Sequence, residues 1–365
     1  MKYIFTFSFL VYSCLLFSQH LGAYTDYKGY FFIFDHGEHH KVEDLPVQSF
    51  RIGGTQVLYI DSKGDLKMYE NGTVKELEKS GVNEYYATDH LAAYSIFEKL
   101  RVIENGEPVT LSYRCPVYRV EDSLIVFYDK NMESLRIYYD GDTEDIESGM
   151  IGIPVQSIRS GDNIVAYISS RVNDFKIYYK GENQTILEHI DRISFKAGKD
   201  IVAYINPLDN TFNAFYRGEI FTLEDFPPRS YRMGDGFVAY VDNMGSFKVF
   251  SSLGVQELSS YAPDGYTCED YILSYSDYDY AKVFTRGNMY ELENYIPRLM
   301  KIDWNTVVYV DNTNRVWMFT GGEKKYLINE MITGLNIYRD LIVIDLKMDQ
   351  HLIYYQGEFY KGMSY

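Results

Sequence analysis

The segment Ile164–Ile168, with the sequence IVAYI, recurs unchanged as Ile201–Ile205 and with small changes as Phe237–Val241. In these copies both alternating sets of side chains are largely apolar, which is typical of a strand that is covered on both faces. The fourth residue, here called the aromatic position, can be followed along the chain at intervals of 33 to 40 residues. It is occupied by Tyr24, Tyr59, Tyr94, Phe127, Tyr167, Tyr204, Tyr240, Tyr275, Tyr309 and, in a degenerate copy, Ile344. The chain therefore contains ten copies of one unit of about 36 residues.

Three further features recur in register with the aromatic position. A glycine follows it by 12 to 14 residues, and a strand-like phrase such as Phe175–Tyr179 (FKIYY) lies between them. A third apolar phrase often ends in Leu-Glu, as at Leu77 and Glu78, and a fourth often closes on Gly-Asp, as at Gly161 and Asp162. Glycine suits tight hairpin turns because it adopts positive φ without steric cost. Each unit is thus predicted to form four short antiparallel strands, with almost no helix in the chain.

Strands that are apolar on both faces must be covered by neighbouring sheets, and sheets packed face to face around an axis give a β-propeller. We therefore predict an all-β fold, a β-propeller built from about ten four-stranded antiparallel repeats of about 36 residues. A β-solenoid is the structural alternative, although its repeats are usually shorter. Ten units exceed the four to eight blades usual for one ring, so two five-bladed rings that meet near residue 190 are also considered.

The ends of the repeat array bear on how the ring closes. No Pro/Gly/Ser-rich linker occurs near residue 190, which favours one continuous domain over residues 19–365. The first unit lacks the strand that precedes its aromatic position, and the last unit ends on its third strand, counted from the strand that carries the aromatic position. No simple exchange of strands between the termini is therefore expected to complete a blade.

Composition narrows the class of protein. The chain has 365 residues, of which 46% are hydrophobic and 24% charged, which is typical of a folded globular protein. Its 35 Lys and Arg stand against 52 Asp and Glu, giving a net charge of −17. This acidity argues against nucleic acid as a partner, because phosphate binding needs a cationic surface.

Residues 1–18 are predicted to be a secretory signal peptide. Lys2 precedes an apolar run from Tyr3 to Phe17 that is too short to span a bilayer stably. We place cleavage after Ser18, with Ala23 as the alternative. Cys14 could accept a lipid, but the apolar run continues after it, where a polar tether is expected. The rest of the chain contains no second run of membrane-spanning length, so no direct membrane insertion is expected.

The end of this leader, Leu16–Gln19, resembles the leaders of secreted Bacteroidota proteins. The resemblance implies an exported protein that is periplasmic, outer-membrane-associated or extracellular in a Gram-negative bacterium.

The most suggestive charged pattern is cationic. Eight residues before the aromatic position, six units carry a Lys or Arg whose sequence neighbours are mostly apolar or aromatic, so the basic side chain points opposite to them. These residues, here called the belt cations, are Arg51, Arg119, Arg159, Lys196, Arg232 and Lys301. If this strand is the innermost of its blade, the belt cations line the channel and can concentrate an anionic ligand or peptide carboxylates. The alternative is a structural one, in which each cation pairs with an acidic side chain of a neighbouring blade.

Other polar residues have simpler interpretations. Six units carry Asp two residues after the aromatic position, and we interpret these residues as turn formers that bond their own backbone: Asp26, Asp61, Asp129, Asp242, Asp277 and Asp311. The stretch Asp140–Asp145 lacks the glycine and the final glutamate of a calcium loop and is interpreted as a hairpin turn. His36 and His40 could share a metal with Glu38, but an exposed turn is the preferred interpretation, and no metal or cofactor is predicted.

The order of these phrases resembles the blades of TolB-type and dipeptidyl-peptidase-type propellers, although the Ser-Pro-Asp-Gly turn of those families is missing here. The resemblance implies a propeller used as a binding platform and transfers no catalytic residue. We therefore expect a non-enzymatic secreted β-propeller that binds a protein or peptide partner, as a scaffolding subunit of an outer-membrane or periplasmic assembly. The alternatives are a carbohydrate-active enzyme and an anionic-ligand sensor that uses the channel.

Overall fold

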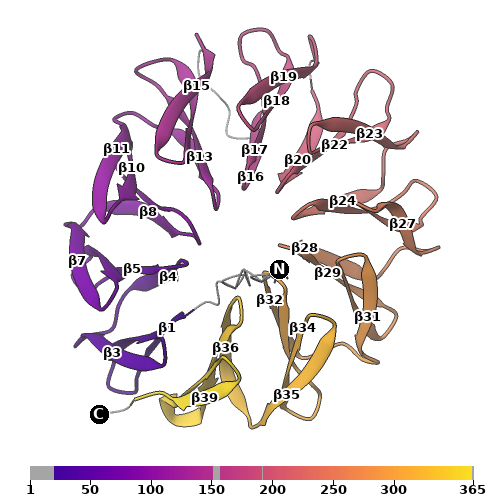
Figure 1. Cartoon of the computed structure of the whole chain (residues 1–365). Helices are drawn as coiled ribbons and strands as arrows, with labels where there is room; N and C mark the ends of the chain where they lie inside the picture. Colours follow the sequence, from indigo (N-terminus) through magenta and orange to yellow (C-terminus); the bar gives the residue numbers. More distant parts are fainter. Residues whose placement is uncertain (1–19, 151–156, 191, 364–365) are drawn as a thin grey trace, which may run out of the picture.

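The computed structural model describes residues 20–150, 157–190 and 192–363, and these form one ring of ten blades around a central channel (Figure 1). The predicted β-propeller is confirmed, and the ring is single, so the alternative of two five-bladed rings is wrong. The predicted signal peptide lies outside the described residues. Helical structure among the described residues is limited to 3-10 segments, at Ser157 and in the short helix η2 (Lys347–Asp349). None of the described residues forms a helix that is long and apolar enough to cross a membrane.

The blades follow the chain in order, and each four-stranded blade runs from its innermost to its outermost strand. Blade 1 has three strands, which are β1 (Leu21–Thr25), β2 (Phe31–Asp35) and β3 (Glu38–Glu43). Blade 2 has β4 (Ser49–Ile52), β5 (Gln56–Ile60), β6 (Leu66–Glu70) and β7 (Thr73–Glu78). Blade 3 has β8 (Val82–Ala87), β9 (Ala92–Ile96), β10 (Lys99–Glu104) and β11 (Glu107–Ser112). Blade 4 has β12 (Val117–Val120), β13 (Leu124–Asp129), β14 (Ser134–Tyr139) and β15 (Asp142–Ser148).

Blade 5 has β16 (Ile158–Gly161), β17 (Ile164–Ile168), β18 (Phe175–Tyr179) and β19 (Glu182–Leu187). Blade 6 has β20 (Ser194–Gly198), β21 (Ile201–Ile205), β22 (Phe212–Tyr216) and β23 (Glu219–Glu224). Blade 7 has β24 (Ser230–Gly234), β25 (Phe237–Val241), β26 (Phe247–Ser251) and β27 (Gly254–Ser259). Blade 8 has β28 (Gly265–Glu269), β29 (Ile272–Asp277), β30 (Tyr280–Thr285) and β31 (Asn288–Glu293). Blade 9 has β32 (Leu299–Asp303), β33 (Thr306–Val310), β34 (Arg315–Thr320) and β35 (Glu323–Asn329). Blade 10 has β36 (Ile332–Tyr338), β37 (Leu341–Leu346), β38 (His351–Tyr355) and β39 (Glu358–Lys361).

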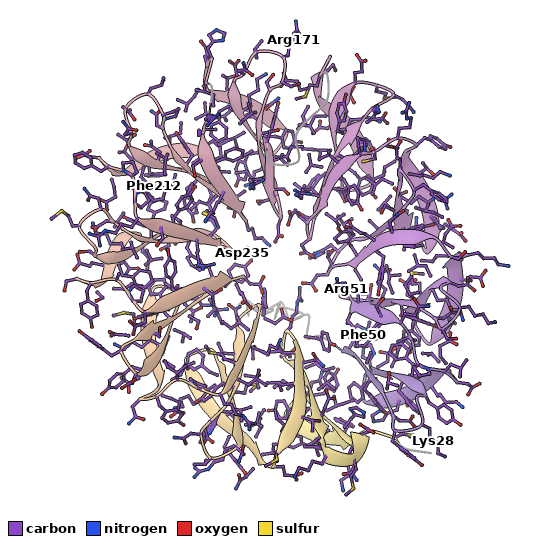
Figure 2. The ribbon with its side chains drawn as sticks, turned by 180° about the vertical axis from the view of Figure 1, so that it is seen from behind. Lys28, Phe50, Arg51, Arg171, Phe212 and Asp235 are labelled. Carbon is purple, nitrogen blue, oxygen red and sulfur yellow. The ribbon has the colours of Figure 1, made fainter. Side chains whose placement is uncertain are left out.

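The aromatic position lies on the second strand of each four-stranded blade and on β1 of blade 1, and these strands are largely buried. In blade 6, Ile201 and Ala203 pack against Tyr240 of blade 7, while Val202 and Tyr204 face the core shared with blade 5. The double-sided apolar pattern thus arises because each sheet is buried between two others, as the sequence predicts. The small alanine lets adjacent sheets approach, and Figure 2 places Phe212 within the body of a blade.

Polar contacts, here called the inter-blade clamp, add to this apolar packing. A glutamate at the end of the outer strand of one blade accepts hydrogen bonds from the tyrosine at the aromatic position and from a Lys of the next blade. Glu224 accepts from the Tyr240 hydroxyl at 3.0 Å and from the Lys248 ammonium at 2.8 Å. Equivalent pairs of contacts centre on Glu43, Glu147 and Glu293, and Arg101 replaces Lys at Glu78. The Leu-Glu motif is therefore a repeated structural device that ties neighbouring blades together.

The ring closes through side chains rather than through a shared sheet. Among the described residues no sheet contains strands from both ends of the chain, as expected. Instead, Tyr24 and Phe32 of blade 1 pack against Leu341 and Val343 of blade 10. The His351 imidazole also lies 2.8 Å from the Thr25 carbonyl oxygen.

Candidate functional site

The central channel collects charged residues because the innermost strands of nine blades line it in the same direction. In Figure 2, Arg51 and Asp235 are directed toward the centre of the ring, whereas Lys28 and Arg171 lie at its outer rim. Each inner strand ends in a turn at one end of the channel, here called the turn mouth, and begins at the other end, here called the start mouth. Charges that recur at one position of the unit are therefore gathered at one level of the channel.

The turn mouth carries residues that stand five positions before the aromatic position. Aspartate occupies this place in five blades, and Lys199 and Arg339 occupy it in two others. In blade 9 the aspartate, Asp303, stands one residue earlier, six positions before the aromatic position. All eight side chains line one cavity of about 290 Å³; its six carboxylates are Asp89, Asp122, Asp162, Asp235, Asp270 and Asp303. The carboxylates outnumber the two cations, so this mouth favours cationic ligands.

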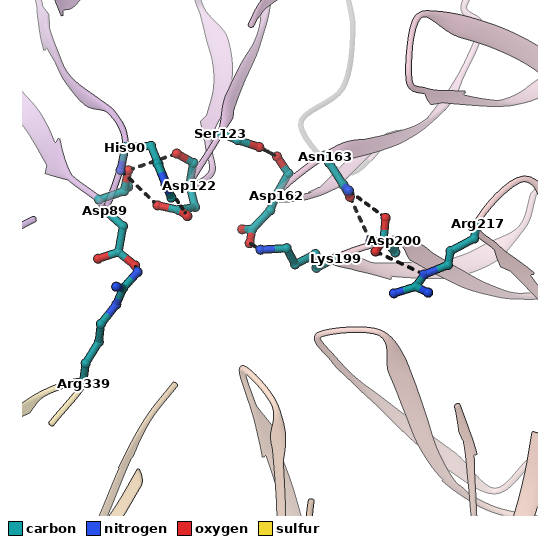
Figure 3. Close-up of polar contacts among 11 residues, drawn as sticks. Asp89, His90, Asp122, Ser123, Asp162, Asn163, Lys199, Asp200, Arg217 and Arg339 are labelled. Carbon is teal, nitrogen blue, oxygen red and sulfur yellow. Dashed lines mark hydrogen bonds and ion pairs between the residues drawn. The ribbon is translucent and has the colours of Figure 1, made fainter. Parts of the chain in front are cut away.

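Contacts between blades hold the turn mouth in shape (Figure 3). Arg339 of blade 10 donates to Asp89 of blade 3, across the place where blade 1 has no described inner strand. Lys199 donates to Asp162 at 3.0 Å, and the His90 ring lies 2.8 Å from Asp122. These contacts leave the side chains of Asp235 and Asp270 without a cation within 4 Å among the described residues.

The gathering of like charges changes how these acids ionise. Burial, followed by repulsion from Asp162 and Asp270, raises the pKa of Asp235 to about 7. Burial is also the main cause that raises the pKa of Glu121 to about 7 and that of Asp303 to about 6. A cation that entered the turn mouth would relieve the repulsion and favour the ionised form of each acid.

The glycines of the Gly-Asp turns let neighbouring inner strands meet at this mouth. A Cβ atom on Gly198 would stand 2.4 Å from the Gly234 carbonyl oxygen, and one on Gly161 would stand 2.3 Å from the Gly198 carbonyl oxygen. Such distances leave no room for a side chain. The chain approaches its neighbour this closely where the wedge-shaped blades converge on the axis.

The belt cations lie on the inner strands as expected, three residues before the positions that line the turn mouth in most blades: Arg51 on β4, Arg119 on β12, Arg159 on β16, Lys196 on β20, Arg232 on β24 and Lys301 on β32. Among the described residues no carboxylate lies within 4 Å of Arg51, Lys196, Arg232 or Lys301. Among the described residues these four cations therefore form no close ion pair, although the charge of Lys301 opposes the rise that burial causes in the pKa of Glu269 in the neighbouring blade. Their role in ligand binding stays a prediction.

Hydroxyl contacts join neighbouring inner strands, and between blades 6 and 7 Lys196 also donates to the Tyr231 carbonyl oxygen at 2.7 Å. Ser194 lies 2.9 Å from the Tyr231 hydroxyl of the next blade, and Ser230 lies 2.8 Å from the Tyr266 hydroxyl of the blade after it. Tyr85 donates to Ser49 at 2.7 Å in the same way. The sequence argument missed this contact because serine and tyrosine are too common in the chain to stand out.

The remaining polar candidates fall into turns. The Asp242 carboxylate accepts the backbone N–H groups of Met244, Gly245 and Ser246, and Asp26, Asp61, Asp129 and Asp311 behave alike. Asp277 differs, because it pairs with Lys282 and accepts from Tyr261. The predicted hairpin turn is formed by Asp140 and Gly141 between β14 and β15, and the rest of the stretch to Asp145 lies at the start of β15.

The histidines around the first hairpin do not form the group of His36, Glu38 and His40 that the sequence analysis considered as a metal site. His36 has ligand atoms within 4.8 Å of those of His20 and Asp35, and these three residues could together offer a metal two imidazoles and a carboxylate. His40 is not part of this group and lies 4.0 Å from Glu38. His20 could not be recognised as a neighbour of His36 from the sequence, because it precedes the first strand.

Comparisons with known proteins agree with this architecture. The family model described as "10-bladed beta propeller domain" matches residues 15–360. The comparison with curated proteins finds no relative of the chain. Among solved structures, the computationally designed Ika8 protein is 13% identical, with a TM-score of 0.35, over 92% of this chain and 99% of that chain.

Two natural proteins are similar at the same level. BamB from Moraxella catarrhalis is 10% identical, with a TM-score of 0.37, over 84% of this chain and 96% of that one. The tricorn protease is 11% identical, with a TM-score of 0.32, over 94% of this chain and 46% of that one. Likenesses of this degree concern the fold and carry no argument about function.

Proposed function

Because the chain belongs to the family of ten-bladed β-propeller domains, we propose that it is a non-enzymatic binding protein whose channel mouths hold a protein or peptide partner. The observation that carries this proposal is the collection of six carboxylates from six separate blades at the turn mouth. Loops and turns on a rigid scaffold are favourable places for recognition. A Lys or Arg side chain of a partner would supply the positive charge that Asp235 and Asp270 lack.

The proposal includes export to the bacterial envelope, where the protein would act as a subunit of an outer-membrane-associated or periplasmic assembly. It rests on the predicted leader, residues 1–18, and on its apolar run. Cleavage after Ser18 would leave β1 (Leu21–Thr25) intact, whereas cleavage after Ala23 would remove half of this strand. The mature protein is therefore proposed to begin at Gln19.

The test is affinity purification from envelope extracts, with the tagged protein as bait. We expect a specific partner to be captured by the wild type and lost with the double variant Asp235→Asn/Asp270→Asn. The matched control is Asp225→Asn/Asp279→Asn, which removes two exposed carboxylates that do not line the turn mouth. Recovery of this chain alone, or equal loss of the partner in both variants, would contradict the proposal.

A carbohydrate-active enzyme is the second candidate, and one observation favours it. Asp235 and Asp303 have pKa values raised to about 7 and about 6, and they share a cavity with Asp162, which pairs with Lys199. A carboxyl group whose pKa is raised toward neutrality can act as a general acid in such a cavity. Activity on a glycan panel that is abolished by Asp235→Asn would establish the enzyme, and an inactive panel would remove this candidate.

A further inference from the structure

A second cavity opens at the start mouth, between blades 6, 7 and 8. Its volume is about 760 Å³, which falls within the range of small-molecule sites. Its walls come from the beginnings of β20, β24 and β28 and from the loops that precede β24 and β28. It is separate from the turn mouth, because the inner strands start here and end there. We call it the start-mouth pocket.

Three cations line the start-mouth pocket. Two are the belt cations Lys196 and Arg232, and the third is Arg229, which the sequence argument did not single out. Lys196 donates to the Tyr231 carbonyl oxygen at 2.7 Å, and Arg229 donates to the Asn243 carbonyl oxygen at 3.0 Å. Within the described chain none of the three cations has a carboxylate within 4 Å, although Asp264 also lines the pocket.

These cations also repel one another. Burial, followed by the charges of Arg232 and Arg159, lowers the pKa of Lys196. Carboxylates are abundant in a protein with a net charge of −17. Among the described residues, however, none lies within 4 Å of the three pocket cations to neutralise them. A cluster of neighbouring cations without an acid is stabilised when an anion enters, since the anion relieves the repulsion and accepts charge-assisted hydrogen bonds.

Aromatic rings hold the cations in place. The Lys196 ammonium lies 4.5 Å from the centre of the Tyr231 ring, and the Arg232 guanidinium lies 5.5 Å from the centre of the Tyr266 ring. Both tyrosine hydroxyls are fixed by the Ser194 and Ser230 contacts between inner strands. The fixed rings thus offer each exposed cation a face to lie against beside the pocket.

The other belt cations provide a contrast. Arg51 and Lys301 occupy the same position of the unit, but neither lines the start-mouth pocket. The pocket is therefore a local feature of blades 6 to 8 and not a property of the whole belt.

We propose that the start-mouth pocket binds a small ligand through an oxyanion, a carboxylate or a phosphate, which Lys196 and Arg232 contact directly and Arg229 approaches from the rim. The inference is independent of the partner proposed for the turn mouth, which is cationic.

Isothermal titration calorimetry with citrate and with inorganic phosphate tests this site on the purified protein. The variant is Lys196→Ala/Arg232→Ala, and the matched control is Arg51→Ala/Lys301→Ala, which removes the same two residue types from the belt outside the pocket. We expect the wild type to bind at least one probe, the variant to bind it about tenfold more weakly or worse, and the control to stay within about twofold. The probe that binds more tightly tells a carboxylate site from a phosphate site.

Two results would overturn the proposal. One is a wild type that binds neither probe at concentrations up to about 10 mM. The other is a loss of affinity in the control that equals the loss in the variant, since this would assign binding to the general charge of the channel. If the double variant does not fold by circular dichroism, Arg232→Gln takes its place, because it removes one charge while preserving much of the side-chain length.

Discussion

The inter-blade clamp and the belt use the same kinds of residue at fixed positions of the same unit, with opposite outcomes. In the clamp, Lys248 lies 2.8 Å from both Glu224 and Asp242. In the belt, Lys196 has no carboxylate within 4 Å among the described residues, although it lies on an inner strand of the neighbouring blade. The difference shows that repetition of a charge does not reveal its role. Ion pairing separates the two roles, because Lys248 is neutralised by two carboxylates, whereas Lys196 donates to the Tyr231 carbonyl oxygen and keeps a positive charge that an anion can approach.

The largest expected effect concerns the inner wall that carries the belt. Gly198→Ala would place a Cβ atom 2.4 Å from the Gly234 carbonyl oxygen, so the inner strands would have to separate. We expect a loss of about 3 kcal/mol in the free energy of unfolding, measured by urea denaturation. Gly265→Ala is the control on another inner strand, since its Cβ would meet nothing closer than 3.8 Å. An equally large loss in the control would rule out close approach as the cause.

The next effect tests the clamp. Glu224→Ala removes the acceptor of the Tyr240 hydroxyl and one partner of Lys248, and leaves a buried hydroxyl without its acceptor. We expect a loss of about 2 kcal/mol. Glu219→Ala, at an exposed position of the same strand β23, should change stability by less than about 0.5 kcal/mol. Equal stability of the two variants would contradict the clamp.

The sequence revealed one side of this comparison better than the other. The ten units, the hairpin glycines and the turn-forming Asp residues follow from local chemistry, and so they could be predicted. The clamp could not, because Glu224 meets Tyr240 and Lys248 only when two blades are packed together. The sequence showed its Leu-Glu phrase merely as the end of a strand.

The turn mouth was hidden for a similar reason. Its repeated Asp is interrupted by Lys199 and Arg339, and Asp303 stands one residue out of register. The contact between Arg339 and Asp89 joins residues 250 positions apart, and no local pattern predicts it. The position of the belt cations could be inferred from strand alternation alone, whereas Arg229 joins them only through the shape of a loop.

The pH dependence of stability provides a smaller effect at the turn mouth. An unfolded Asp has a pKa near 4, whereas that of Asp235 is about 7 in the folded protein. Between these values the folded state binds more protons than the unfolded state, so stability falls as pH rises from about 5 to about 8. We expect Asp235→Asn to reduce this fall by about 1 kcal/mol or more, measured by denaturation at both pH values. An unchanged slope would show that Asp235 does not titrate in this range.

The most direct measurement compares two lysines by urea denaturation at neutral pH. Lys248→Ala removes a clamp cation with two carboxylate partners, and Lys196→Ala removes a belt cation with none within 4 Å among the described residues. We predict that the clamp variant loses about 2 kcal/mol, whereas the belt variant, which gives up the hydrogen bond to the Tyr231 carbonyl oxygen, loses less than about 1 kcal/mol. Equal losses in the two variants would contradict the division between structural and ligand-binding charges.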